Sequence, residues 1–387
     1  MAIPLVIQAK AMSIRLLTIA LAIVFLSTLL VSFDHDNIQP HKNGTLVLGN
    51  EVEDSMVIPL PGGAIGPESF SFDGSGGGPY TGVSDGRIIR WLANESRWVD
   101  FAVTSPQRDG CEGPRDHSKM EHICGRPLGL HFNKNTGDLY ITDAYMGLLV
   151  VGPNGGLASP LTKQVDGVSF GLTNSLDIDQ SSGVVYFTDS STRFPRRNYV
   201  SVIISGDNSG RLMKFEPKTN KTTILLDNLK FPNGVALSQN GNFLLFVETT
   251  TCRLFKFWLK TPKAGKIEVI AQFPGFPDNI KRNGNGEFWV GINSRRGKFL
   301  EWIISNPWIG KSLIRVFPID VTKVHLCLAR WIAKTGMGIR LNRDGNVVEV
   351  LDSKRWKFVS EVDEDSGSLW IGSVTMPFVV KETISSL

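Results

Sequence analysis

Short runs of hydrophobic residues alternate with polar residues along most of the chain, and turns carrying Gly, Asn or Pro separate these runs. The clearest example spans residues 231–292, where β-branched, aromatic and other apolar residues fill four segments, 234–237, 243–248, 253–259 and 267–271. Strands favour such residues, and tight turns favour Gly and Asn. This stretch therefore predicts an antiparallel meander of four strands.

The same pattern recurs at intervals of about 45–60 residues, a spacing typical of propeller blades. Each repeat has a turn with Gly followed by a strand, as in TGDLYITD, SGVVYFTD, NGNFLL, NGEFWV and SGSLWI. An opening unit, GPESFSFD, brings the number of repeats to six. We predict an all-β fold, a six-bladed β-propeller over residues 41–387, whose last blade combines strands from both chain ends. Segment 293–345 breaks the rhythm, and its Trp and Ile residues predict a helical insertion over one end of the channel.

Residues 1–40 lie outside this pattern and are expected to form a signal segment and linker. Lys10 and Arg15 precede an unbroken apolar run over 16–33, and acidic residues follow it. This arrangement predicts a secretory signal peptide or an uncleaved signal anchor. Positive charge before the run places the rest of the chain on the lumenal side in either case. We expect the secretory pathway, either the vacuole or ER lumen, with membrane-anchored and extracellular forms left open.

The overall charge gives little indication of a macromolecular partner. The chain has 41 Lys and Arg residues against 37 Asp and Glu residues, so we expect no nucleic-acid binding. Basic residues predominate between positions 281 and 357, which indicates a solvated face or, alternatively, contact with an anionic ligand or membrane surface. Otherwise we expect membrane contact only through an uncleaved N-terminal segment.

A lumenal location makes further predictions. Asn43, Asn94 and Asn220 each begin an N-glycosylation sequon in a polar, turn-like context. Cys111 and Cys124 bracket a polar loop and are predicted to form a disulfide. A Cys/His metal site with His117 and His122 of that loop is the alternative, although the spacing matches no zinc pattern. Cys252 and Cys327 are expected to be buried free thiols.

Oxygen-bearing side chains recur where the first strand of each repeat begins. They are Glu68, Asn174, Asn233, Asp278 and Asn279. The innermost strands of a propeller line its channel, so these residues should converge from separate blades onto the axis. Two carboxylates and three amide oxygens suit a hard cation, Ca²⁺ before Mg²⁺. The alternative is that each residue only forms hydrogen bonds with the backbone of its own turn.

The motifs GPESFSFD, GPYTGVSDGRIIRW, CGRPLGLHF, FPNGVALS and FPDNIKRN make the chain resemble plant strictosidine synthase-like proteins over roughly residues 55–385. The resemblance implies a six-bladed propeller related to paraoxonases and gluconolactonases. True strictosidine synthases condense tryptamine with secologanin through a glutamate, and the resemblance places Ser360 at that position, with Glu361 one residue further on. A serine hydroxyl cannot act as a general acid or base at neutral pH, which disfavours this Pictet–Spengler condensation.

The hydrolase relatives, by the same resemblance, keep the residue types found here at the five candidate metal positions. We therefore expect a Ca²⁺-dependent hydrolase of small-molecule esters, lactones or phosphotriesters. Paraoxonases use a histidine near the position of Tyr145, so that catalytic group is not carried over. The catalytic candidates are Tyr145 and His131, followed by the strand-end acids Asp143, Asp189 and Glu248. A non-catalytic, ligand-binding propeller with structural Ca²⁺ is a further alternative.

Overall fold

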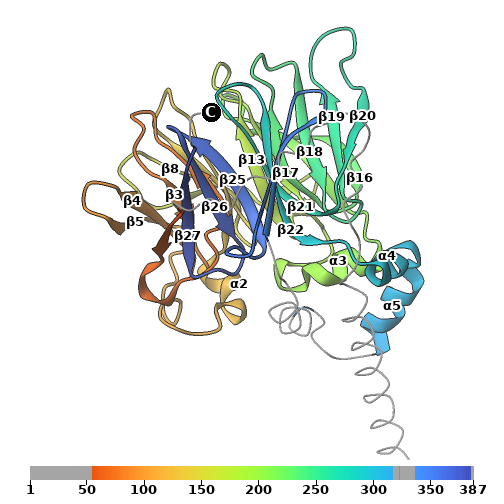
Figure 1. Cartoon of the computed structure of the whole chain (residues 1–387), viewed down its shortest axis with the longest axis horizontal. Helices are drawn as coiled ribbons and strands as arrows, with labels where there is room; N and C mark the ends of the chain where they lie inside the picture. The colour runs from red at the N-terminus through yellow and green to blue at the C-terminus, as the bar shows by residue number, and fades with distance from the viewer. Residues whose placement is uncertain (1–54, 317–321, 323–335, 385–387) are drawn as a thin grey trace, which may run out of the picture.

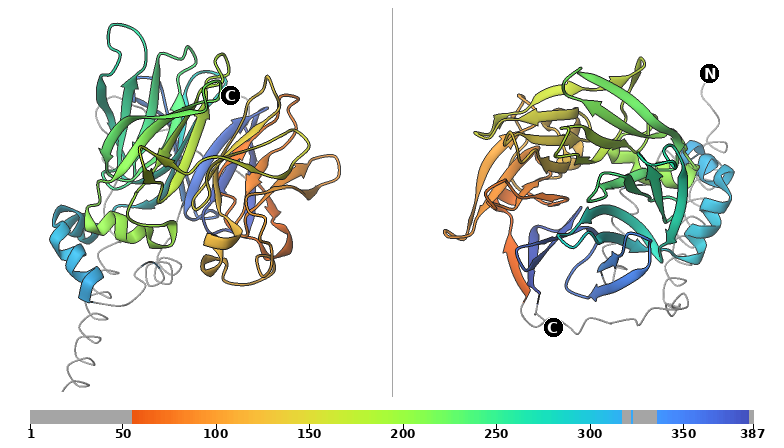
Figure 2. Two further views of the ribbon diagram at one scale, coloured as in Figure 1. Left: turned by 180° about the vertical axis from the view of Figure 1, so that it is seen from behind. Right: turned by 90° about the horizontal axis from the view of Figure 1, so that it is seen from above.

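Six sheets of four or five strands stand side by side around a common axis, as the right-hand view of Figure 2 shows, and all but one of their strand pairs are antiparallel. The computed structural model describes residues 55–316, 322 and 336–384. Each sheet begins with a strand next to the axis and continues outward by hairpins. The predicted all-β, six-bladed β-propeller is therefore confirmed.

Each blade contains four or five strands, in order from the axis outward. Blade one contains β2 (Phe70–Ser71), β3 (Tyr80–Gly82), β4 (Arg87–Leu92), β5 (Arg97–Val103) and the added β9 (Gly156–Leu157). Blade two contains β6 (Pro127–Phe132), β7 (Leu139–Asp143), β8 (Gly147–Val151) and β10 (Ser159–Thr162). Blade three contains β13 (Thr173–Ile178), β14 (Val185–Asp189), β15 (Gly210–Glu216) and β16 (Lys221–Leu229). Blade four contains β17 (Pro232–Leu237), β18 (Phe243–Glu248), β19 (Arg253–Trp258) and β20 (Ile267–Gln272). Blade five contains β21 (Gly275–Arg282), β22 (Phe288–Arg295), β23 (Gly336–Leu341) and β24 (Val347–Ser353). Blade six contains β25 (Val359–Asp365), β26 (Ser368–Ser373), β27 (Phe378–Thr383) and β1 (Ser55–Pro59).

The ring closes through β1, which pairs antiparallel with β27 from the other end of the chain. Ser55 lies opposite Glu382 and Pro59 opposite Phe378. The outermost strand of blade six thus comes from the beginning of the described chain, as predicted. This pairing joins the two ends of the described chain in one sheet. Strand β1 covers the outer edge of β27, which would otherwise be open.

The core lies between the blades. Every residue of β14 and β18 is buried, because neighbouring blades cover both faces of these second strands. This explains why their sequences, VYFTD and FLLFVE, are almost continuously apolar rather than alternating. Their charged ends, Asp189 and Glu248, lie at the same end of the blades.

The described residues contain four α-helices besides three short 3-10 helices, and the four α-helices lie at the same end of the propeller (Figure 1). The predicted helical insertion is present as α4 (Lys298–Ser305) and α5 (Pro307–Val316), which pack on α3 (Tyr199–Ser205). Helix α3 was not predicted, because its sequence YVSVIIS has the β-branched composition of a strand. Helices α3 and α5 touch closely: a Cβ added to Gly310 would lie 1.8 Å from the carbonyl oxygen of Ile204.

Among the described residues, no helix has the length and apolar character needed to cross a bilayer. The predicted signal or anchor segment, Asn43 and Cys327 all lie outside the described residues. Asn94 and Asn220 are exposed in turns, as their sequons require. A short helix, α2 (Glu121–Cys124), ends at one cysteine of the predicted disulfide, and the Cys111–Cys124 bond is present. Cys252 is a buried free cysteine, although it lies in the turn before β19 rather than in a strand.

Candidate functional site at the start of the inner strands

A register irregularity occurs at the same level in the innermost strands of five blades. It lies between Pro127 and Gly129 in β6, and at the corresponding points of β13, β17, β21 and β25. A bulge leaves residues out of the ladder and turns their side chains. The bulged positions hold Leu128, Asn174, Asn233, Asp278, Asn279 and Ser360. This irregularity is why residues from different blades meet at one level of the axis.

The bulges are held by the neighbouring blades. Thr188 donates a hydrogen bond to the carbonyl oxygen of Asn233 at 2.8 Å, and Thr249 donates to that of Pro277 at 2.8 Å. Gly234 has no room for a side chain, since a Cβ there would lie 2.4 Å from the nitrogen of Ile280. The Pro-Asn-Gly motif therefore serves close packing between inner strands as well as the site.

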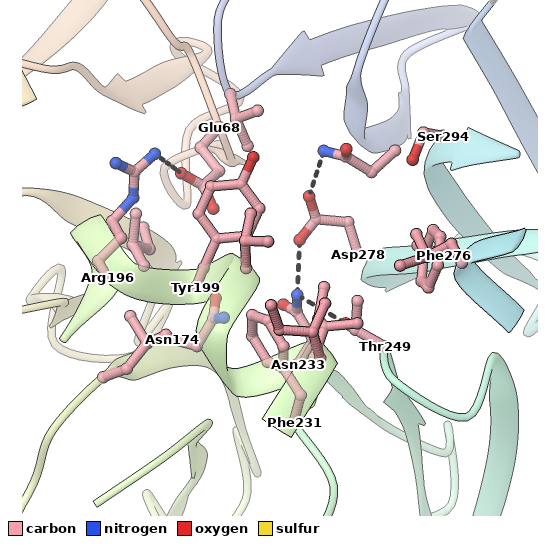
Figure 3. A pocket seen from close by; sticks show the side chains of 18 residues that line it. Glu68, Asn174, Arg196, Tyr199, Phe231, Asn233, Thr249, Phe276, Asp278 and Ser294 are labelled. Atoms are coloured by element: carbon pink, nitrogen blue, oxygen red, sulfur yellow. Dashed lines mark hydrogen bonds and ion pairs between the residues drawn. The ribbon is translucent and has the colours of Figure 1, made fainter. Parts of the chain in front are cut away.

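Four of the five predicted metal-binding residues line one cavity of about 110 Å³, shown in Figure 3. They are Glu68, Asn174, Asn233 and Asp278; Asn279 is buried next to them and donates to the carbonyl oxygen of Glu68. The remaining wall is mostly apolar and comes from the blades and from α3 and α4. The cavity thus combines a polar floor with an apolar enclosure.

Three amide oxygens at this floor are buried and have no hydrogen-bond partner among the described residues. They belong to Asn174, Asn233 and Asn279. Their amide nitrogens are used: Asn174 donates to Ser190 at 2.9 Å, and Asn233 donates to Asp278 at 2.7 Å. An unsatisfied buried oxygen costs about 1–3 kcal/mol, so three so close together require a partner, which a cation or ordered water can supply.

Asp278 is the most perturbed carboxyl group of the cavity. Burial, followed by the nearby carboxylate of Glu68, raises its pKa to about 8. Hydrogen bonds from Asn233 at 2.7 Å and Asn293 at 3.3 Å act in the opposite direction. Two buried carboxyl groups that repel each other form a site that a cation would stabilise.

Glu68 has a cationic neighbour that the sequence did not reveal. Nη2 of Arg126 lies 3.1 Å from Oε2 of Glu68, and both side chains are almost completely buried. The same nitrogen donates to the carbonyl oxygen of Gly66 at 3.0 Å. Burial lowers the pKa of Arg126, and the charge of Arg196 lowers it further. This ion pair occupies one oxygen of Glu68.

Arg196 begins a short 3-10 helix (Arg196–Asn198) just before α3 and lies in the cavity wall. One of its nitrogens lies 2.7 Å from Glu121, and the other lies 3.8 Å from Glu68. Although burial by itself lowers the pKa of Arg196, the carboxylates of Glu121 and Glu68 raise it above its usual value. Glu121 belongs to α2, next to the disulfide, so the loop closed by Cys111 and Cys124 positions this guanidinium.

The chemistry of the donor set fits Ca²⁺. No group of three or more His, Cys, Asp or Glu side chains suited to a metal ion occurs within the part of the chain that the structure describes. The candidate set instead consists of two carboxyl groups and three partnerless amide oxygens, an all-oxygen shell of the kind Ca²⁺ accepts. The Arg126 ion pair leaves the other oxygen of Glu68 available.

The two predicted catalytic residues do not line this cavity. The Tyr145 hydroxyl lies 3.2 Å from Glu121 and accepts a hydrogen bond from the backbone of Arg197, so it supports the Arg196 network. His131 lies three residues beyond Leu128 on β6, about 10 Å further along the axis. Its Nδ1 is 3.1 Å from Asp177, and burial lowers its pKa to about 4.

The strand-end acids serve the framework. Asp143 accepts from the backbone nitrogen of Arg126 at 2.7 Å, and Asp189 accepts from that of Leu172 at 2.9 Å. Glu248 accepts from the backbone nitrogen of Lys230 at 2.8 Å. Each acid therefore fixes the chain just before the inner strand of its own blade.

Ser360 is completely buried and donates a hydrogen bond to the carbonyl oxygen of Glu68 at 2.7 Å. The neighbouring Glu361 accepts from the backbone nitrogen of Phe70 at 2.6 Å and lies outside the cavity wall. In the loop of the disulfide, His117 bonds to Ser84 and to the carbonyl oxygen of Gly113, and His122 is exposed. Because His117 is used in these hydrogen bonds, His122 is exposed and Cys111 and Cys124 are bonded to each other, these four residues form a disulfide loop rather than a Cys/His metal site.

These features define a six-bladed propeller with an oxygen-lined cavity where its inner strands begin. A family model described as strictosidine synthase matches residues 174–262, and one described as strictosidine synthase-like, N-terminal, matches residues 52–91. Strictosidine synthase-like 2 of Arabidopsis thaliana is 52% identical over 349 residues, covering 88% of this chain and 92% of the relative. Strictosidine synthase-like 10 of the same plant is 49% identical, covering 82% and 85%. The chain belongs to the plant strictosidine synthase-like family.

Solved structures agree on the fold. A gluconolactonase from Xanthomonas campestris matches with a TM-score of 0.55 and 12% identity, covering 86% of this chain and 90% of that chain. Regucalcin of Agrobacterium tumefaciens, described as a calcium-binding protein, matches with a TM-score of 0.52 and 13% identity, covering 84% and 90%. At such identities the similarity concerns the propeller alone.

Proposed function

We propose that this protein is a Ca²⁺-dependent hydrolase that cleaves esters or lactones of small molecules, with phosphotriesters as a further substrate class. The three partnerless amide oxygens beside two carboxyl groups carry this proposal. Glu68, Asn174, Asn233, Asp278 and Asn279 would hold the ion. When bound, Ca²⁺ polarises a carbonyl or phosphoryl oxygen and stabilises the developing negative charge.

The apolar wall contributes binding and exclusion of water. Ile203 of α3, Phe231 and Phe276 face the cavity together with several other aliphatic side chains. These surfaces favour the organic part of a substrate and strengthen electrostatic interactions at the polar floor. Arg196, held by Glu121, provides a fixed donor to a substrate oxygen.

Asp278 is the best candidate in the cavity for accepting a proton from water. Among the residues that line the cavity, only Glu68 and Asp278 carry carboxyl groups, and Glu68 is paired with Arg126. In the ion-free protein burial raises the pKa of Asp278 to about 8, and a bound cation lowers it, so the group would be ionised near neutral pH and able to accept a proton. Asp278, whose two oxygens accept hydrogen bonds from Asn233 and Asn293, would help to hold the ion, and it would take the proton from the attacking water and return it to the leaving alcohol.

Two other functions have less support. Condensation of the strictosidine synthase type requires a carboxyl group at position 360, where a buried serine instead bonds to the backbone. A non-catalytic propeller with a structural ion is compatible with the donor set, but it gives no role to the apolar cavity beside that set. We also propose that the protein acts in the secretory pathway, where the disulfide would be maintained.

The test uses the full chain, purified and loaded with Ca²⁺. Bound calcium is measured, and phenyl acetate and simple lactones are assayed with and without EDTA, beside tryptamine plus secologanin. We expect hydrolysis that EDTA abolishes and that Asp278→Asn reduces, whereas Glu382→Gln leaves it unchanged. Calcium binding without turnover would instead support the structural role, and an alkaloid product would support condensation.

A further inference from the structure

Helix α5 displays an exposed stripe that combines an aromatic residue with two basic residues. Trp308 is 68% exposed, and Lys311 and Arg315 are exposed three and seven residues further on. Positions separated by three, four and seven residues lie on one face of a helix. Trp308, Lys311 and Arg315 therefore form one surface, here called the α5 face.

The opposite side of α5 is used for packing. Gly310 lies against α3, and Ile314 contacts the cluster formed by Val200, Ile204 and Ile303. The apolar residues on this side thus hold the helix in place, whereas Trp308 has no role in that core. An exposed tryptophan of this extent calls for a partner other than the propeller.

The charges indicate the kind of partner. No ion pair to Lys311 or Arg315 occurs within the described part of the chain. The side chains of these two residues are long enough to reach past the helix surface, and tryptophan prefers the boundary between lipid and water. An amphipathic helix with a cationic face and an aromatic anchor is typical of elements that lie on anionic membranes.

We propose that the α5 face docks on an anionic lipid surface. Helices α4 and α5 lie at the end of the propeller that carries the cavity, and Leu300 of α4 lines the cavity itself. Docking would place the cavity next to the membrane, which suits a substrate that partitions into lipid.

The test must report on α5 locally, because the apolar run at residues 16–33 would attach the full chain to vesicles by itself. The full chain is mixed with vesicles of phosphatidylcholine, with or without phosphatidylserine. Amide hydrogen exchange is measured over residues 307–316, together with quenching of tryptophan fluorescence by doxyl-labelled lipid. With phosphatidylserine we expect slower amide exchange over residues 307–316 and quenching of tryptophan fluorescence. In Trp308→Phe, the part of the quenching that phosphatidylserine adds should be lost.

The charge-reversal variant Lys311→Glu/Arg315→Glu is expected to weaken docking by more than about 25-fold, because the loss of two basic residues alone accounts for roughly that factor and the new carboxylates are repelled by the anionic surface. The control is Lys266→Glu/Val269→Ser, which alters an exposed basic residue just before β20 and an exposed apolar residue on that strand, and it should have no effect. Equal protection with neutral and anionic vesicles would overturn the proposal. So would protection that depends on protein concentration without lipid, which indicates a second copy, or no protection at all.

Discussion

The pKa of Asp278 predicts that calcium binding depends on pH. In the calcium-free protein the pKa is raised to about 8, so at pH 6 the group is almost entirely protonated. A metal ligand must be deprotonated, and binding therefore releases a proton. Between pH 6 and pH 8 the ionised fraction rises from about one in a hundred to about one half, which predicts a roughly fiftyfold gain in affinity, or about 2.3 kcal/mol.

The assay is isothermal titration calorimetry in buffers of different ionisation enthalpy, which counts the protons released per ion. Asp278→Asn removes the titrating group, so we expect weaker binding that no longer changes over this pH range. Glu382→Gln is the matched control, because burial raises the pKa of Glu382 to about 7 although it lies on β27, outside the cavity. A wild-type affinity that is constant from pH 6 to pH 8 would refute the reasoning.

As pH rises, the stability of the calcium-free protein should fall, whereas its calcium affinity should increase. Because the pKa of Asp278 in the folded state lies above its ordinary value of 3.8, the folded protein binds more protons than the unfolded chain between these two values. The contribution of Asp278 to the stability of the calcium-free protein is therefore present at low pH and is lost as pH rises through about 8. Excess Ca²⁺ should raise the melting temperature most at the alkaline end, which differential scanning calorimetry can measure.

Three further changes test the framework around the site. Asn174→Leu removes one partnerless oxygen, so calcium affinity should fall, whereas the free energy of unfolding in EDTA should change by no more than about 1 kcal/mol. Calcium titration measures the affinity, and urea unfolding measures the stability. An unchanged affinity would exclude Asn174 as a ligand. Ser360→Glu should destabilise the protein by about 1–3 kcal/mol through overpacking at a fully buried position, and should produce no alkaloid; a stable variant that condenses tryptamine would contradict this. Cys111→Ala/Cys124→Ala opens a ring with a sequence separation of 13 and should lower the free energy of unfolding by about 3 kcal/mol. In that variant hydrolysis should also fall, since Glu121 and Arg196 lose their support; full activity would argue against the role of Arg196.

Local sequence determined much of the fold. Turn residues and β-branched runs predicted the antiparallel meanders, because turn and strand preferences act between residues that are close in the sequence. In β18, the predicted limits 243–248 match the observed strand, and the limits of β19 differ by one residue. Helix α3 is the exception, since packing against α4 and α5 outweighs the strand preference of its sequence.

The sequence also determined which residues of the inner strands face the cavity, because Glu68, Asn233 and Asp278 recur at one point of a repeat. Only the tertiary structure decided what surrounds them. Arg126 lies in a loop and Arg196 in a short 3-10 helix, both outside the repeated strand pattern, so no pattern could bring their guanidinium groups to Glu68. Ring closure joins blades that are far apart in the chain, and that proximity raises the pKa of Asp278 and leaves the amide oxygens without partners.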